Sequence, residues 1–321
     1  MEELTIAFRN GTPLQQCDVE QIRRTLGHRN NFLVAKAAQL AIEANLSTML
    51  PEVLAAYDRF FLDAATTDPR CQAKTTLAKA LVAFEHRQRD AFLRGMRHVQ
   101  MEPVWGGSAD SAGALRGTCV HALVDCPGLS DAELLQHFAA AMVDSNKTVR
   151  IEAARAIGNV GGISGALLLR LRIHLGLRDR DEEEAEVLGT CFSALLALEG
   201  QEAIPLLVQA LEAGDEFSAE AAYALAELRE PASLQALSDR WKKGADSWFA
   251  PILLSAIALT RLPDAIELLL RLLEEESRDA DTAIEALARS APSQELRNRI
   301  EQIVHHSGSP RLQKALAEHL R

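Results

Sequence analysis

The residues best suited to bind another molecule lie together in the irregular stretch Val99–Asp110. Glu102, Trp105 and the adjacent Gly106 and Gly107 stand there in a segment that we predict to be a loop. A carboxylate can pair with a cation, an indole can bury a large apolar surface, and glycines let a backbone approach a ligand closely. We therefore predict that these four residues contact a partner. The alternative is that Trp105 fills the groove between two neighbouring helical pairs.

A basic cluster lies just upstream, in His86–His98, which contains four arginines. Helical spacing places Arg87 and Arg94 near one side of a helix and Arg97 partly on another. This pattern predicts a patch that binds an anion or an acidic partner. The alternative is an ordinary solvated helix face.

Catalytic and metal-binding motifs are not recognisable. The sequence has no H-E-x-x-H, G-x-S-x-G or P-loop pattern, and its nine histidines are scattered. Its five cysteines form no C-x-x-C pair, which argues against a zinc knuckle and a disulfide framework. We predict no catalytic residues, no metal and no cofactor. This favours a non-enzymatic protein but leaves the question of an enzymatic activity open.

Composition favours an all-α fold. Hydrophobic residues make up 48% of the 321 residues but aromatic residues only 5%, and the strong helix formers Ala and Leu dominate. No uninterrupted apolar run is long enough to span a membrane, and Glu2 and Glu3 stand where a secretory signal would carry positive charge. We predict a cytoplasmic protein.

The negative charge is concentrated in the second half. Residues 1–160 contain 17 Lys and Arg against 18 Asp and Glu, whereas residues 161–321 contain 17 against 27. An acidic surface is poorly suited to nucleic acid, because phosphates require basic residues. The charge fits a partner with a basic face.

A recurring Ala followed by an aliphatic residue indicates an internal repeat. Successive copies are 28 to 42 residues apart, about the length of two short helices and two turns, and their alanines are Ala41, Ala80, Ala122, Ala156, Ala194, Ala224, Ala258, Ala286 and Ala315. Each period therefore predicts one pair of helices. One pair cannot bury its apolar face alone, so the pairs must stack.

The best-formed copy, Asp144–Gly162, contains Val149-Arg-Ile-Glu-Ala-Ala-Arg-Ala-Ile-Gly158 and resembles the bacterial form of the HEAT repeat. The resemblance implies a right-handed α-α superhelix, an armadillo-like solenoid of about eight to nine helical hairpins. We place an N-terminal cap at 1–28 and one continuous solenoid at 29–321, with a more regular, acidic half from about 161. Similar repeats occur in phycobilin lyases.

Three repeats also place an acid six residues before a base. In HEAT repeats such residues form a ladder between neighbouring helical pairs, so the resemblance gives these six a structural role. They are Asp68 and Lys74, Asp110 and Arg116, and Asp144 and Arg150.

The function that we predict is a scaffold or adaptor that binds a protein or peptide on the concave face of the solenoid. One alternative is a lyase or chaperone-like subunit acting on a cofactor-bearing protein, with its site near 99–119. A second is nucleic-acid binding through 86–98, which the acidic composition disfavours. The sequence leaves the oligomeric state open.

Overall fold

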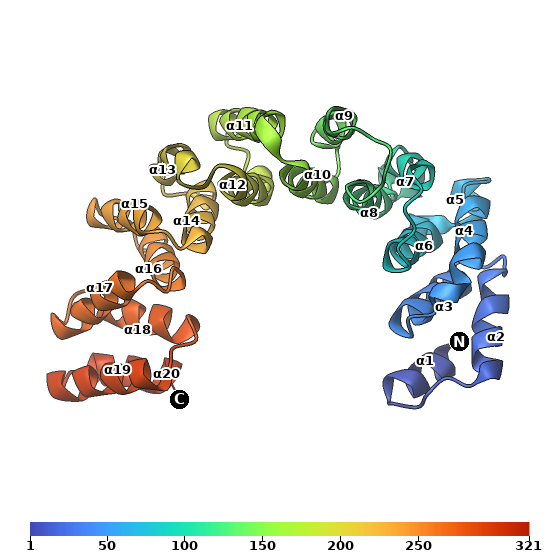
Figure 1. The fold of residues 1–321 in the computed structure, drawn as a ribbon. Helices are drawn as coiled ribbons and strands as arrows, with labels where there is room; N and C mark the ends of the chain where they lie inside the picture. Colours follow the sequence, from blue (N-terminus) through green and yellow to red (C-terminus); the bar gives the residue numbers. More distant parts are fainter. Residues whose placement is uncertain (321) are drawn as a thin grey trace. The chain divides into compact units, whose positions relative to one another are not determined.

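The computed structural model describes residues 1–320 and is almost entirely helical (Figure 1). Within those residues the exception is one two-stranded antiparallel sheet, β1 paired with β2. The all-α prediction is confirmed.

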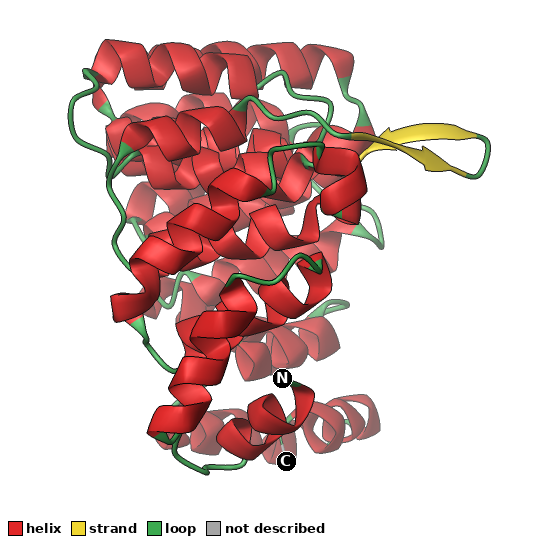
Figure 2. Cartoon of the chain, turned by 90° about the vertical axis from the view of Figure 1, so that its right-hand side faces the viewer, coloured by secondary structure: helices red, strands yellow, loops and turns green. Residues whose placement is uncertain are grey.

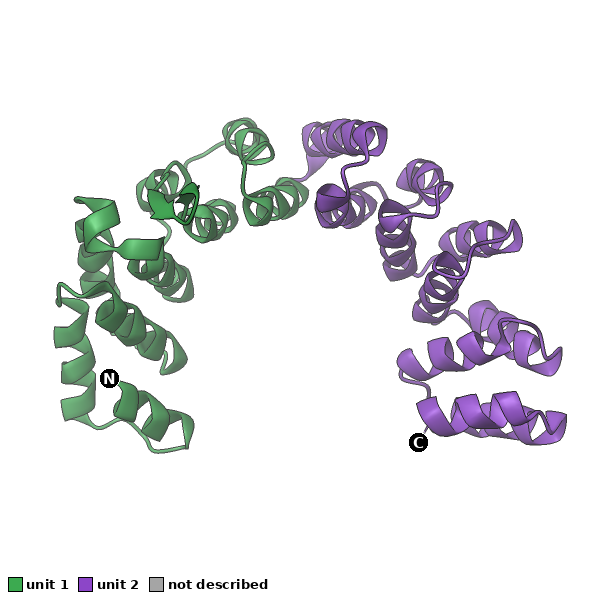
Figure 3. Ribbon diagram, turned by 180° about the vertical axis from the view of Figure 1, so that it is seen from behind, with its two compact units in different colours: residues 1–160 green, residues 161–321 purple. Residues whose placement is uncertain are grey.

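The chain divides into two compact units, Met1–Val160 and Gly161–Arg321 (Figure 3). At the start of the second unit Gly161 and Gly162 have φ angles of 74° and 67°. Residues with a Cβ rarely adopt this backbone conformation. The second unit carries the acidic excess, with 17 Lys and Arg against 27 Asp and Glu. The predicted cap at 1–28 and single solenoid at 29–321 stay predictions.

The first unit is built from helices packed in two layers. Helices α3, α6, α8 and α10 pack in succession, and α2, α4, α7 and α9 each pack mainly against one member of that row. Its helices are α1 (Glu2–Arg9), α2 (Gln16–Leu26), α3 (Asn31–Glu43), α4 (Leu50–Arg59), α5 (Ala64–Thr67), α6 (Gln72–Ala83), α7 (Arg89–Met96), α8 (Gly113–Leu123), α9 (Asp131–Ala141) and α10 (Lys147–Val160). Short 3-10 helices, η1 (Ser47–Met49) and η2 (Pro69–Cys71), precede α4 and α6, and the strands are β1 (Met101–Val104) and β2 (Gly107–Asp110).

The second unit repeats this pattern. Helices α12, α14, α16, α18 and α20 pack in succession, and each odd-numbered helix from α11 to α19 packs against the even-numbered helix that follows it. Its helices are α11 (Gly162–Asp179), η3 (Glu182–Glu184), α12 (Ala185–Glu199), η4 (Gly200–Ala203), α13 (Ile204–Leu211), α14 (Glu216–Leu228), α15 (Pro231–Lys242), α16 (Phe249–Leu259), α17 (Pro263–Glu274), α18 (Ala280–Arg289), α19 (Gln294–Ser307) and α20 (Pro310–His319).

The repeated alanines explain the close packing of the inner rows. Eight of the nine are buried, and Ala194 is half-buried. A methyl group lets neighbouring helices approach closely, and the adjacent Leu or Ile fills the space between rows. Local signals fix where helices begin, as at Ser130, whose side chain and that of Glu133 form a capping box at the start of α9.

One stretch, Glu182–Leu211, is long and apolar enough by length and composition to cross a membrane. The chain turns within it at Gly200, which separates α12 from α13. Phe192 and Leu195 of α12 are completely buried in the second unit. This stretch therefore serves as part of the core of that unit.

Candidate functional site

The stretch predicted to be a loop forms a β-hairpin. Met101 pairs with Asp110 and Val104 with Gly107, so only Trp105 and Gly106 form the turn. Gly106 has a φ of 87°, the left-handed conformation required at the second central residue of a type II turn. Pro103 lies within β1, and proline is tolerated on the edge of a sheet where no N–H is needed.

The β-hairpin projects away from the helices and carries Trp105 at its tip (Figure 2). The Trp105 side chain is fully exposed, at 102% of its reference area, so it does not fill a groove between helical pairs. Val99, Met101 and Val104 are also 50–61% exposed. An isolated exposed apolar residue needs no explanation, but four within seven positions on one projecting element suggest a contact surface.

The base of the β-hairpin is fixed by hydrogen bonds to the 3-10 helix η2. Gln100 is 3% exposed, and its Nε2 donates to the carbonyl oxygen of Asp68 at 2.8 Å. The Glu102 carboxylate accepts from the backbone N–H of Arg70 at 2.7 Å and from the Ser111 hydroxyl at 2.7 Å. Glu102 thus positions the β-hairpin, whereas Trp105, Gly106 and Gly107 are exposed at its tip.

These bonds also set the ionisation of Glu102. Partial desolvation acts to raise its pKa, but hydrogen bonds from Ser111, Gln100 and the Arg70 backbone together lower the pKa below its usual range. The carboxylate is therefore ionised at neutral pH and remains an acceptor for all three donors.

Arg116 of α8 joins the end of the β-hairpin to Asp144, in the turn that precedes α10. Its guanidinium donates to Asp110 at 2.5 Å and, through two nitrogens, to both carboxylate oxygens of Asp144 at 2.8 Å each. A further bond reaches the carbonyl oxygen of His98 at 3.0 Å. Arg150 donates to the carbonyl oxygen of Asp144 at 2.6 Å. Arg116 is only 3% exposed. The end of the β-hairpin is therefore bonded to a buried network of paired charges.

The first acid and base of the predicted ladder are completely buried. Lys74 Nζ lies 3.1 Å from the Asp68 carboxylate and also donates to the carbonyl oxygen of Phe60. Asp68 accepts from the backbone N–H groups of Ala73 and Lys74 and from the Asn31 side chain of the preceding helical pair. Both charges are compensated, as burial requires.

The basic cluster is partly used in packing. Arg94 pairs with Asp58, and its guanidinium lies 4.4 Å from the centroid of the Phe61 ring. Arg89 donates to the carbonyl oxygen of Gly128. Arg87 and Arg97 are exposed. All four arginines are exposed, two of them with a partner, and the anion-binding patch stays a prediction.

A groove that sequence reasoning missed runs over the exposed side of α6, α8 and α10. Its volume is about 530 Å³, and Gly117 forms part of its floor. The complete lining is Lys79, Val82, Ala114, Gly117, Thr118, His121, Thr148, Glu152 and Arg155. Small residues at Ala114, Gly117 and Thr118 keep it open. Equivalent positions of three successive helical pairs thus form one continuous surface.

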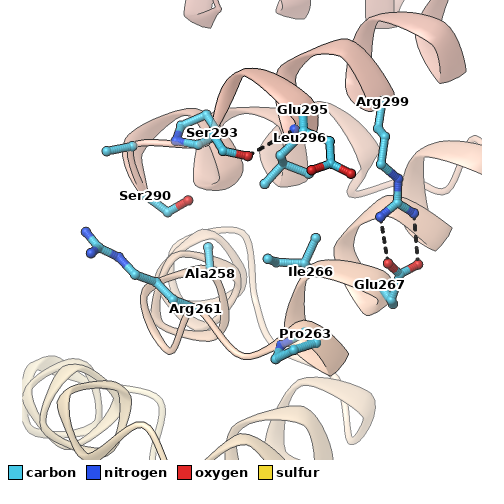
Figure 4. Close-up of a pocket in the computed structure, with 12 residues that line it drawn as sticks. Ala258, Arg261, Pro263, Ile266, Glu267, Ser290, Ser293, Glu295, Leu296 and Arg299 are labelled. Carbon is cyan, nitrogen blue, oxygen red and sulfur yellow. Dashed lines mark hydrogen bonds and ion pairs between the residues drawn. The ribbon is translucent and has the colours of Figure 1, made fainter.

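The second unit contains a cavity of about 600 Å³ at the beginnings of α17 and α19 (Figure 4). Glu267 and Arg299 face each other at one side and form two hydrogen bonds of 2.8 and 3.1 Å. Ser293 lies on the opposite side and caps α19 by accepting from the Leu296 N–H. Glu267 and Arg299 therefore satisfy each other, and Ser293 is occupied in capping α19.

The chain's buried thiols are not activated. Burial raises the pKa of Cys71, Cys119 and Cys191 to about 12, so each stays protonated at neutral pH. Among residues 1–320, no group of three or more His, Cys, Asp or Glu side chains could hold a metal ion.

Comparisons with known proteins leave the family open. No protein-family model matches the chain, and no curated protein matches it. Among solved structures, it is similar to the crystal structure of an engineered protein from the Northeast Structural Genomics Consortium, with 18% sequence identity and a TM-score of 0.34. That similarity covers 98% of this chain and 86% of the other.

Proposed function

We propose that the helical pairs are repeats of the HEAT type and form a right-handed α-α solenoid. The regular packing of alternate helices within each unit supports this proposal, as does the burial of the repeated alanines. The contact of Arg116 with the acids of two successive repeats is of the kind expected for a HEAT ladder.

We further propose that the protein is a non-enzymatic scaffold that binds a protein partner through the β-hairpin. The observation that carries this proposal is the full exposure of Trp105 at the tip of an anchored element. Tryptophan is among the residues that contribute most to protein interfaces, and a preorganised element loses little conformational entropy on binding. Water is a poor environment for an indole, so a partner's apolar pocket would stabilise it.

The groove over α6, α8 and α10 supplies a second contact surface in the same unit. In a HEAT-like solenoid this row of helices would form the concave face, where we predict a peptide to bind. Lys79, Arg155 and Glu152 line the groove and can pair with charges on a peptide. The pairing of Arg94 with Asp58 offsets part of the positive charge of the basic cluster, which favours a protein partner over nucleic acid.

We also propose a cytoplasmic location. All five cysteines are free, including the exposed Cys17. Reduced thiols are typical of cytosolic proteins.

Site-specific photocrosslinking tests the binding proposal. A photoreactive phenylalanine analogue replaces Trp105 in the full chain, and native lysate is irradiated. We expect one defined crosslinked protein, identified by mass spectrometry. The matched control carries the analogue at Trp248, which is 45% exposed in the second unit.

The partner must also bind the unlabelled protein, and its binding must fall at least about tenfold for Trp105→Ala while Trp248→Ala leaves it unchanged. Identical crosslinks from both positions, or none from Trp105, would refute the proposal.

A further inference from the structure

The longest helix of the second unit, α11, exposes an unbroken apolar ridge. Ile163, Leu167, Leu171 and Leu175 are 83, 61, 57 and 40% exposed. They are spaced four residues apart along most of the 18-residue helix. Large aliphatic side chains aligned in this way are unusual on a surface that meets only water.

The helix itself is held firmly from its other side. Ile173 and Leu169 are completely buried, and Arg170 forms an ion pair with Glu199 of α12. Gly176 packs so closely on α12 that a Cβ there would lie 2.5 Å from a methyl group of Leu188. The exposed ridge is therefore part of a fixed surface.

We propose that this ridge binds the same ridge of a second copy of the chain, in an antiparallel arrangement about a twofold axis. Residues at i, i+4, i+8 and i+12 form a ridge inclined to the helix axis, and two such ridges interdigitate in the commonest class of helix packing. A twofold axis requires a surface that complements itself. The α11 ridge meets that requirement because it is uniform and uncharged along its length.

The distribution of charge selects the antiparallel direction. The exposed titratable side chains beside the ridge, His174 and Arg178, both lie near its C-terminal end, where Asp179 pairs with Arg178. The N-terminal end carries Ser164 and no charge. Antiparallel pairing keeps the titratable ends of the two copies apart, and it opposes the two helix dipoles.

The size of the ridge predicts a weak dimer. Its four side chains span roughly 18 Å of helix at about 1.5 Å per residue. Stable dimers bury about 800 Å² on each partner, which exceeds what one helix face of this length supplies. We expect a dissociation constant on the order of 10 μM, so that dimers form only at high local concentration.

Sedimentation velocity of the full chain from about 1 to 200 μM tests the proposal. The wild-type weight-average mass should rise toward twice that of the monomer, whereas Leu171→Glu should weaken association at least about tenfold because it buries a charge without a partner. Leu62→Glu is the matched control, since Leu62 is 70% exposed in the first unit. It should behave as the wild type.

Cysteine crosslinking tests the direction. The experiment uses a Cys17→Ser background, which removes the exposed cysteine. If the twofold axis passes near residue 169, antiparallel pairing places Leu167 opposite Leu171 of the other copy. An equimolar mixture of Leu167→Cys and Leu171→Cys chains should form the mixed disulfide in excess over either homodimer. A wild type that stays monomeric, a Leu171→Glu variant that dimerises normally, or a preference for homodimeric disulfides would each overturn the proposal.

Discussion

A pair of oppositely charged residues is buried in the core of the first unit, at positions that hydrophobic residues could also fill. Asp68 and Lys74 are completely buried, and every charge there is matched by an opposite charge or a hydrogen bond. Such pairs add little net stability, but removing one partner leaves a buried charge uncompensated. The two residues are therefore interdependent.

The change Lys74→Met should lower the free energy of unfolding of the first unit by about 3–5 kcal/mol, because the Asp68 carboxylate loses its counter-ion. Hydrogen exchange in increasing urea, read separately for the two units, measures this effect. Lys79→Met is the control, since Lys79 is exposed on the same helix, and it should change stability by less than about 0.5 kcal/mol. Adding Asp68→Asn to Lys74→Met should recover part of the loss; a further loss would contradict this account.

Acid should release the β-hairpin. The pKa of Glu102 is lowered in the folded protein, so its contribution is fully present above the unfolded-state pKa of about 4.3 and is lost as the pH falls through the lower folded value. The pKa of Asp110 is shifted in the same direction, because hydrogen bonds from Gln100, Ala112 and Arg116 outweigh desolvation. The protection factors of the amides of residues 101–110, which correct for the pH dependence of intrinsic exchange, should fall below about pH 4.

The Glu102→Gln variant should show faster exchange of the same amides already at pH 7 and a smaller change on acidification. Unaltered exchange in this variant at both pH values would show that Glu102 does not anchor the β-hairpin.

At the scale of elements, close approach between helices depends on single glycines. A Cβ at Gly95 of α7 would lie 2.3 Å from the Tyr57 hydroxyl and 2.4 Å from the Cys119 sulfur. Tyr57 and Cys119 are completely buried on α4 and α8, so neither has room to move aside. Gly95 thus sets the distance at which α7 meets two neighbours.

The substitution Gly95→Ala should therefore destabilise the first unit by about 1–3 kcal/mol through overpacking. Gly107→Ala offers a comparison, because a Cβ there meets nothing within 4 Å and φ is not positive. Its effect should be within about 0.5 kcal/mol. Urea denaturation of both variants measures the two changes in stability. Equal midpoints would contradict the packing argument.

The sequence predicted the helical elements better than it predicted their surfaces. The alanine repeat located helices because one small buried residue per pair is a strong, local signal. The β-hairpin was predicted to be a loop because two four-residue strands containing Pro103 and Gly107 are too short for an alternating pattern to appear. The groove was missed because its lining comes from three helices far apart in sequence.

The α11 ridge shows a different limit of sequence reasoning. Apolar residues at Ile163, Leu167 and Leu171 have the spacing of a face that normally points into the core. The same helix carries a second apolar face, with Leu169 and Ile173, and that face is buried. Periodicity identifies both faces, but only packing decides which of them meets solvent.

At the scale of the whole molecule, the two units differ in charge much more than in architecture. The first has 17 basic and 18 acidic residues, and the second has 17 and 27. Repulsion among like charges destabilises a compact unit and is screened by salt over about 10 Å at 0.1 M. The units should therefore respond differently to ionic strength.

Raising NaCl from about 10 to 150 mM should increase the melting temperature of the second unit by several degrees and that of the first unit by less. Hydrogen exchange at stepped temperatures distinguishes the units within the intact chain. Potassium sulfate at matched ionic strength would reveal general salting-out, because that effect stabilises both units alike. A first unit that gains more than the second would disprove the explanation from net charge.

The exposed indole at the β-hairpin tip also gives the protein a built-in optical reporter. The chain contains three tryptophans, and replacing Trp241 and Trp248 by phenylalanine would leave Trp105 as the sole indole fluorophore. Because Trp105 is fully hydrated, its emission should lie at the red limit for tryptophan and should be readily quenched by iodide. Any molecule that encloses the tip will shift the emission to the blue and shield it from quenching, so binding can be followed without attaching a dye.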